Sequence, residues 1–283
     1  MLFADGHLHT NPVKGLGART IAKKFKEVNG WFMVLVGLSP KHLGFNMDFD
    51  GYVKSVDVLL KECQAAKEEG LKVVCLSGIH PADVDDLITR NPRDGEKILD
   101  MAINILNYIG KLIKNGLVDG IGEIGRPHYK TIPESFVANS IILRYALTLA
   151  KDLNCFVHLH LEQGGYLTVL DIENIVKNHN IDKYKIVLHH SDISTSEEAL
   201  KRGFIFTIPG KYQVLKEAFR RFSPDYIIES DFIDDPKRPG VSSYPWQIVE
   251  NQLKLLHENA VDENYLWKLN VDNIAKFYNV SPP

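Results

Sequence analysis

The sequence predicts a single-domain α/β fold, a (β/α)8 TIM barrel, over residues 1–283. Eight short apolar or β-branched segments alternate with longer segments of helical periodicity, which is the pattern of parallel strands joined by helices. The strand segments are apolar almost throughout, as expected for a parallel sheet buried on both faces. Such a barrel typically takes about 250 residues, so one barrel would use nearly the whole chain. A doubly wound open sheet is the second choice, and no Gly-x-Gly-x-x-Gly motif supports it.

The expected strands are short, and a helical segment follows most of them. They lie at residues 2–9, 31–39, 72–81, 119–125, 155–162, 185–191, 203–210 and 225–232. Helical segments lie at residues 18–29, 50–70, 95–116, 134–153, 166–179, 196–203 and 214–222, with two more at 245–260 and 262–278. Gly70 and Gly116 end two of these segments, as is typical of helix stops.

Composition and charge exclude several classes of protein. The chain has 33 basic and 36 acidic residues, a net charge of −3, which is not the basic balance of a protein that grips nucleic acid along its length. Cys63, Cys75 and Cys155 form no Cys-x-x-Cys motif, so we expect reduced thiols and no disulfide framework. The chain shows no signal peptide and no apolar run near the roughly 18 residues of a membrane span. We therefore expect a soluble, cytoplasmic protein without a membrane partner.

Histidines gather at the carboxyl ends of the expected strands. Of 11 histidines, seven lie in strand segments: His7, His9, His80, His158, His160, His189 and His190. Two carboxylates, Glu123 and Asp231, have the same placement in apolar surroundings, where a lone charge is costly. Active sites of such barrels lie at the carboxyl ends of the strands, and a metal ion commonly holds buried imidazoles and carboxylates together.

The spacing of these residues favours chelation of metal. Side chains two apart on a strand share a face, so His7 and His9 would project together into the barrel mouth, as would the pair 158 and 160. His189 and His190 are adjacent, so at most one is expected to face the axis. Glu123 has two carboxylate oxygens with which it could bridge two ions. Zinc, manganese and magnesium all accept such ligands.

Short motifs in this order resemble the TatD-type metal-dependent deoxyribonucleases of the amidohydrolase superfamily. The matching segments are Asp5–His9, Gly78–Pro81, Gly122–Gly125, Phe156–His158, Val187–His189, Glu229–Asp231 and Asn270–Phe277. The chain departs from the family pattern at other segments: Arg126–Tyr129 replaces Leu-Asp-Tyr, His160 replaces an arginine, His189–Ile193 replaces His-Cys-Phe-Ser-Gly, and Phe232 replaces a proline.

The resemblance implies a hydrolase with two divalent metal ions, most readily Zn²⁺, with Mg²⁺ or Mn²⁺ as alternatives. It implies that the first ion is held by His7, His9 and Asp231, the second by His158 and His189, and that Glu123 bridges both. Asp231 would also be the catalytic base for the attacking water. The candidates to bind substrate are His80, Arg126, His128, His160, Lys237 and Arg238.

The resemblance favours a phosphoester substrate, as in a nuclease or phosphoesterase. A small molecule or the end of a nucleic acid strand would enter the barrel mouth, and we expect no groove for long duplex DNA. Three alternatives stay open. The segment Asp5–Thr10 also resembles the start of the PHP phosphoesterases, which bind three ions. The substrate could instead be an amide or lactone, and the barrel could bind metal without catalysis.

Overall fold

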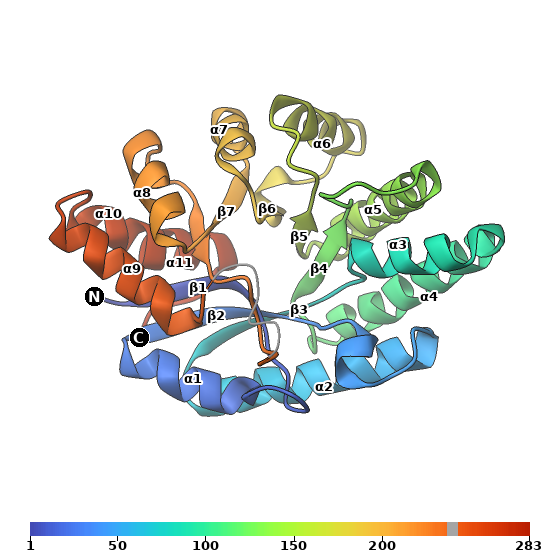
Figure 1. The fold of residues 1–283 in the computed structure, drawn as a ribbon, viewed down its shortest axis with the longest axis horizontal. Helices are drawn as coiled ribbons and strands as arrows, with labels where there is room; N and C mark the ends of the chain where they lie inside the picture. Colours follow the sequence, from blue (N-terminus) through green and yellow to red (C-terminus); the bar gives the residue numbers. More distant parts are fainter. Residues whose placement is uncertain (237–242) are drawn as a thin grey trace.

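Parallel strands form one curled sheet in the order β8-β7-β6-β5-β4-β3-β2-β1-β9, and helices lie around its outside (Figure 1). The structure is a computed structural model that describes residues 1–236 and 243–283. Its strands are β1 (Phe3–His9), β2 (Gly30–Val36), β3 (Lys72–Ser77), β4 (Gly120–Gly125), β5 (Phe156–His160), β6 (Ile186–His189), β7 (Ile205–Pro209), β8 (Ile227–Glu229) and β9 (Phe232–Ile233). The expected (β/α)8 barrel is confirmed.

The last strand position of the barrel is divided between β8 and β9. β8 pairs with β7, and β9 pairs with β1 through Leu8 and His9. Between them, the Asp231 amide donates to the His7 carbonyl at 2.9 Å, which joins the two edges. Gly6 lets β1 approach β8 closely, because a Cβ at this position would collide with the Ile227 side chain.

The helices follow the expected alternation. They are α1 (Gly17–Glu27), α2 (Phe49–Glu68), α3 (Pro81–Arg90), α4 (Gly95–Lys114), α5 (Pro133–Leu153), α6 (Tyr166–Asn178), α7 (Ile193–Arg202), α8 (Tyr212–Arg221), α9 (Pro245–His257), α10 (Glu263–Trp267) and α11 (Asn273–Tyr278). Short 3₁₀ turns lie at η1 (Pro40–Leu43), η2 (Pro92–Asp94) and η3 (Lys183–Lys185). None of the described helices is long and apolar enough to cross a membrane.

Two helical regions differ from the sequence prediction. Helix α3 is not among the expected helical segments, and the strand expected at 72–81 is shorter in the structure. β3 ends at Ser77, and Pro81 occupies the first turn of α3, where a missing N–H costs nothing. The single helix expected at 262–278 is instead α10, a π-helical segment η4 (Lys268–Asp272) and α11.

The expectation of no disulfide is wrong for one pair of cysteines. Cys63 on α2 and Cys75 on β3 are disulfide-bonded, with their Cα atoms 6.2 Å apart, whereas Cys155 is free and buried. Helix α2 leads directly into β3 and packs against it, so two cysteines 12 residues apart in sequence become neighbours in space. Cysteine spacing alone does not show this return of the chain.

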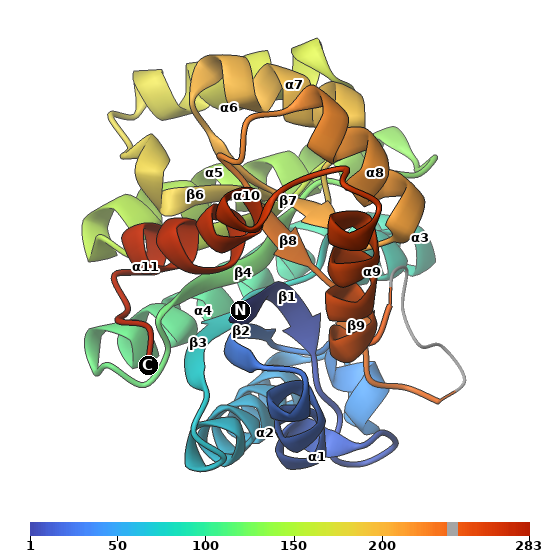
Figure 2. The ribbon, with the colours of Figure 1, turned by 90° about the vertical axis from the view of Figure 1, so that its left-hand side faces the viewer.

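The C-terminal helices close the end of the barrel where the strands begin (Figure 2). Tyr278 of α11 packs its ring 5.0 Å from the ring of Phe32 and 5.3 Å from that of Phe156, measured between centroids. Asn270 of η4 ties this cap to β1, since its Oδ1 accepts a hydrogen bond from the Ala4 amide at 3.1 Å. The opposite end, where the strands finish, stays open for a site.

Replacing Asn270 by alanine should destabilise the barrel by about 3 kcal/mol. Asn270 is 1% exposed, and its Nδ2 also donates to Gln252 Oε1 and the Leu266 carbonyl. The variant therefore leaves several buried polar groups without their hydrogen-bond partner. Urea unfolding would measure the change, with exposed Gln64→Ala as the matched control. A loss as small as that of the control would show that η4 does not secure the barrel.

Candidate metal centre

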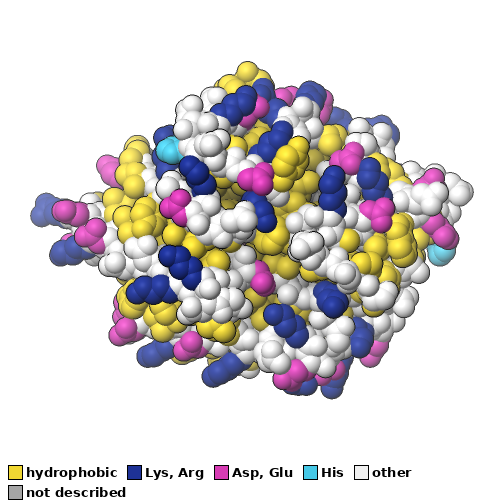
Figure 3. Space-filling model, turned by 180° about the vertical axis from the view of Figure 1, so that it is seen from behind, with side chains coloured by type: hydrophobic (Ala, Val, Ile, Leu, Met, Phe, Trp, Pro, Cys, Tyr) yellow, Lys and Arg dark blue, Asp and Glu magenta, His cyan; other side chains and the backbone are white. Residues whose placement is uncertain are grey.

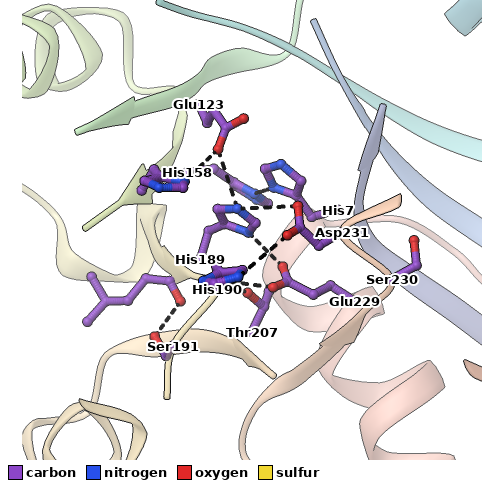
Figure 4. A network of polar contacts seen from close by, with 12 residues as sticks. His7, Glu123, His158, His189, His190, Ser191, Thr207, Glu229, Ser230 and Asp231 are labelled. Atoms are coloured by element: carbon purple, nitrogen blue, oxygen red, sulfur yellow. Dashed lines mark hydrogen bonds and ion pairs between the residues drawn. The ribbon is translucent and has the colours of Figure 1, made fainter. Parts of the chain in front are cut away.

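The carboxyl ends of five strand positions bring imidazoles and carboxylates to one place. Glu123 on β4 lies at the middle of the cluster and is 6% exposed. Its Oε1 lies 3.3 Å from His9 Nε2 on β1. Its Oε2 lies 2.9 Å from His160 Nδ1 on β5 and 3.4 Å from His189 Nε2 on β6. Figure 4 shows Glu123 above His189 and Asp231 beside it, with both carboxylates directed at the same ring nitrogen, Nε2.

Electrostatic interactions keep Glu123 ionised despite its burial. Burial alone would raise the pKa of this carboxyl, but the surrounding imidazoles, led by His80 and His160, lower its pKa well below the usual value. The same carboxylate raises the pKa of His9 against the opposing effect of burial. A buried anion enclosed by nitrogen ligands is the arrangement of a metal site.

The histidines of β1 and β6 present their Nε2 atoms to this centre. His9 Nδ1 donates a hydrogen bond to the Val36 carbonyl, 3.0 Å away, so Nδ1 carries a proton and Nε2 is the nitrogen available to a cation. His189 Nδ1 lies 2.7 Å from Glu229 Oε2, and its buried Nε2 makes no hydrogen bond. His7 Nε2 lies 3.3 Å from His9 Nε2. Carboxylate or carbonyl partners on Nδ1 are what metal-binding histidines usually have, so the residues fit a divalent cation.

Asp231 reaches the centre from a break in the last strand. Its backbone φ of 49° is left-handed, a conformation that aspartate tolerates, and it turns the side chain inward between β8 and β9. Its Oδ1 lies 3.9 Å from His189 Nε2, and its Oδ2 lies 3.6 Å from His190 Nε2. Burial raises the pKa of Asp231 to about 7.

Both His189 at the end of β6 and the adjacent His190 reach the centre, so the expectation that at most one would do so is wrong. β6 ends at His189, and His190 follows with a left-handed φ of 57°. Strand alternation therefore no longer applies to His190. Its amide donates to Glu229 Oε1 at 3.1 Å, which holds the turn in place.

The two histidines of β5 lie at different depths. His160, expected to bind substrate, contacts Glu123 directly, and its Nε2 lies 2.7 Å from His128 Nδ1. His158, expected to bind metal, lies one layer below. Its Nδ1 lies 3.1 Å from His7 Nδ1 and its Nε2 lies 2.8 Å from the Tyr278 hydroxyl. Burial lowers the pKa of His158 to about 3, so this ring is neutral.

A cavity of about 250 Å³ opens above Glu123 and Asp231. Among the expected substrate-binding residues, His80, His128 and His160 line it. Arg126 does not, because its guanidinium pairs with Glu162 through two bonds of 2.7 Å and with Asp171 at 2.5 Å. Lys237 and Arg238 lie outside the described residues.

Three residues near the centre were not assigned a role from the sequence. They are Glu229, which orients His189; His190, which approaches Asp231; and Tyr278, which contacts His158. A glutamate two residues before Asp231, directly after the apolar run 226–228, is the sequence signal that could have identified Glu229. Nothing local marks Tyr278, which is 120 residues from its partner.

Comparison with known proteins assigns the chain to a family. The family model described as TatD related DNase matches residues 4–279. The chain belongs to this family. An uncharacterized protein of Methanocaldococcus jannaschii is 28% identical to this family member over 281 residues, covering 98% of this chain and 95% of the relative.

Solved structures show the same fold at low identity. A TatD-like protein from Archaeoglobus fulgidus matches with a TM-score of 0.67 and 18% identity, covering 98% of this chain and all of that one. A TatD homolog from Escherichia coli K12 matches with a TM-score of 0.65 and 16% identity over 98% of both chains. With the family assignment and the ligand cluster, this TatD-family chain is a metal-dependent hydrolase.

Zn²⁺ affinity should fall as the pH is lowered from 8 to 6, in part through Asp231. Its pKa of about 7 means that below pH 7 the metal-free protein holds a proton that the cation must displace, whereas above pH 7 it does not. This proton alone should weaken binding about tenfold at one pH unit below its pKa. Calorimetry in buffers of different ionisation enthalpy would count the released protons, and Asp231→Asn should release one fewer at pH 6. Equal proton release by both proteins would contradict this assignment.

Proposed function

We propose that this chain hydrolyses phosphoesters with two divalent metal ions. The observation that carries the proposal is the division of contacts at Glu123: Oε1 faces His9, and Oε2 faces His160 and His189. One oxygen for each ion is the expected role of a bridging carboxylate. His7, His9 and Asp231 would hold the first ion, and the second would be held by His160 and His189, not by His158. The nitrogen-rich set favours Zn²⁺, and Mn²⁺ or Mg²⁺ are alternatives.

The ions would supply Lewis-acid chemistry that lowers the pKa of water and offsets charge on the substrate. Asp231 would take a proton from the attacking water at a carboxylate oxygen and deliver it to the leaving-group oxygen. Its left-handed turn places that carboxylate on the cavity wall, within 3.6 Å of His190 Nε2. Glu123 would hold both ions through charge and would not move a proton.

His80 is suited to donate a hydrogen bond to the substrate. It caps α3, and its Nδ1 accepts a hydrogen bond from the Ala82 amide at 2.9 Å. Burial lowers its pKa to about 4, so the ring is neutral and its one proton lies on Nε2. That N–H lies 3.6 Å from Glu123 Oε1 on the wall of the cavity, where it would stabilise charge that develops on a phosphoryl oxygen.

The size of the cavity supports a small substrate or a strand end. About 250 Å³ admits a phosphoester group with a small attached part, and a duplex would not enter. On the face seen in Figure 3, lysines and arginines are interspersed with acidic side chains and form no continuous basic stripe. Among the neighbours in fold, the phosphotriesterase homology protein from Escherichia coli holds phosphate in its active site; it matches with a TM-score of 0.64 and 12% identity over 98% of both chains.

The function is tested by turnover of phosphodiesters, phosphomonoesters, lactones and amides by protein loaded with Zn²⁺ or Mn²⁺. We expect turnover of a phosphoester. Asp231→Asn should reduce it at least 100-fold, by order of magnitude, while retaining most bound metal, because an amide cannot accept the proton. Glu123→Gln should lower occupancy at both metal positions, since both ions lose the same charge.

The exposed helical variant Asp57→Asn is the control for Asp231→Asn and should keep wild-type turnover. Metal content measured on each variant separates lost chemistry from lost metal. Turnover of lactones or amides alone would reject the phosphoester substrate. Near-normal activity of Asp231→Asn would reject Asp231 as the base.

DNA, if it is cleaved, should be attacked at strand ends or in short single strands. Because few basic side chains surround the described mouth, turnover of a single-stranded oligonucleotide should depend only weakly on salt between 50 and 200 mM, a range in which a protein with many phosphate contacts loses about 10³-fold or more. The slope of log turnover against log salt measures this. Tight binding of long duplex with a steep slope would contradict it.

A further inference from the structure

A line of polar side chains runs through the buried interior from the capped end of the barrel to the candidate metal centre. The Tyr278 hydroxyl on α11 lies 2.8 Å from His158 Nε2. His158 Nδ1 lies 3.1 Å from His7 Nδ1, and His7 Nε2 faces the centre. All three residues are buried, and Figure 4 shows the rings of His158 and His7 next to each other.

The contact between the two Nδ1 atoms holds one shared proton. In a hydrogen bond between two neutral imidazoles, one nitrogen carries the proton and the other accepts it. His7 can offer a lone pair to a cation at Nε2 only if its own proton is on Nδ1. His158 Nδ1 must then be the acceptor, its proton must lie on Nε2, and the Tyr278 oxygen must accept from it. In the reverse order, His7 Nε2 carries a proton and cannot bind a cation.

The other two imidazoles that present Nε2 have direct acceptors for the proton on Nδ1. His9 uses the Val36 carbonyl, and His189 uses the Glu229 carboxylate. Within the described residues, the hydrogen-bond partner of His7 Nδ1 is another imidazole, which can act as donor or acceptor. Tyr278 ends this line, and its hydroxyl is the group that has to accept from His158 Nε2 in the order that frees His7 Nε2.

We propose that Tyr278 and His158 are positioning residues that set the tautomer of His7 and so prepare its Nε2 for metal. Neither residue touches substrate or metal in this arrangement. The proposal depends on the proposed function only in that His7 binds a cation, and it assigns His158 a supporting place beneath the ligands.

The Tyr278 hydroxyl can be removed without disturbing its packing. Its ring is held by the rings of Phe32, Phe156 and Phe277, with centroids 5.0, 5.3 and 4.8 Å away. Tyr278→Phe keeps these contacts and deletes only the oxygen. Tyr226→Phe is the matched control, because Tyr226 is equally buried, and its hydroxyl contacts Tyr265, outside this line.

The experiment measures Zn²⁺ affinity by competition with a chromophoric chelator and Zn²⁺ stoichiometry by metal analysis. Tyr278→Phe should weaken affinity about 10- to 100-fold, at the unchanged stoichiometry of the wild type, and Tyr226→Phe should have no effect. His158→Phe should cause a similar loss, and the double variant should lose little more. Unchanged or tighter binding by Tyr278→Phe would overturn the proposal, as would loss of one ion in His158→Phe alone.

Imidazole ¹⁵N NMR gives a readout that needs neither substrate nor the His158 variant. In the Zn²⁺-loaded wild type, His158 should be protonated on Nε2 and His7 on Nδ1. Protonation of His158 on Nδ1 would overturn the positioning role of Tyr278 and His158 even if the enzyme were active. Tightly bound Zn²⁺ without phosphoester turnover would instead reject the proposed function and leave that positioning role intact.

Discussion

The buried carboxylate of Glu123 is the interaction on which the rest of the site depends. A charge with 6% exposure inside a barrel is stable only if partners replace the water it loses. His9, His160 and His189 approach it from three different strands, and His80 approaches from the start of α3. Parallel strands in register place their carboxyl ends at one rim, so a barrel is suited to this convergence. Protonated imidazoles in this group would repel one another, and the carboxylate of Glu123 opposes that repulsion.

Two left-handed residues extend the site beyond what regular strands would allow. His190 follows β6 and Asp231 follows β8, each with a positive φ. Regular alternation would place adjacent residues on opposite faces of the sheet. The turn at His190 instead adds a second imidazole from one strand end. The turn at Asp231 divides the last strand, and its amide still pairs with His7, so closure of the barrel and delivery of a carboxylate depend on the same residue.

The partners of a charged side chain at the rim decide whether it faces the cavity or connects the surrounding loops and helices. Arg126 follows the same strand as Glu123, yet Glu162 and Asp171 take its guanidinium, and the ring of Phe136 lies 5.6 Å from it. It therefore fixes the loops after β4 and β5 to α6. Among the imidazoles that line the cavity, His80 and His190 are neutral and can donate hydrogen bonds without adding positive charge.

The sequence by itself determined the barrel and most of the residues that meet at its mouth. Alternating strands and helices predict a parallel sheet wrapped by helices. In such a sheet all strands end at the same rim, so polar residues at their carboxyl ends are brought together there. For His7 and His9, the two-residue period of a strand also fixed a shared face. Only the tertiary structure decided depth and partners. His158 and His160 satisfy the same period, yet only His160 reaches Glu123, while His158 meets a tyrosine from α11. The Cys63–Cys75 bond and the pairing of Arg126 have the same origin. A local period fixes the direction of a side chain, but its level in the barrel and its contacts depend on segments distant in sequence.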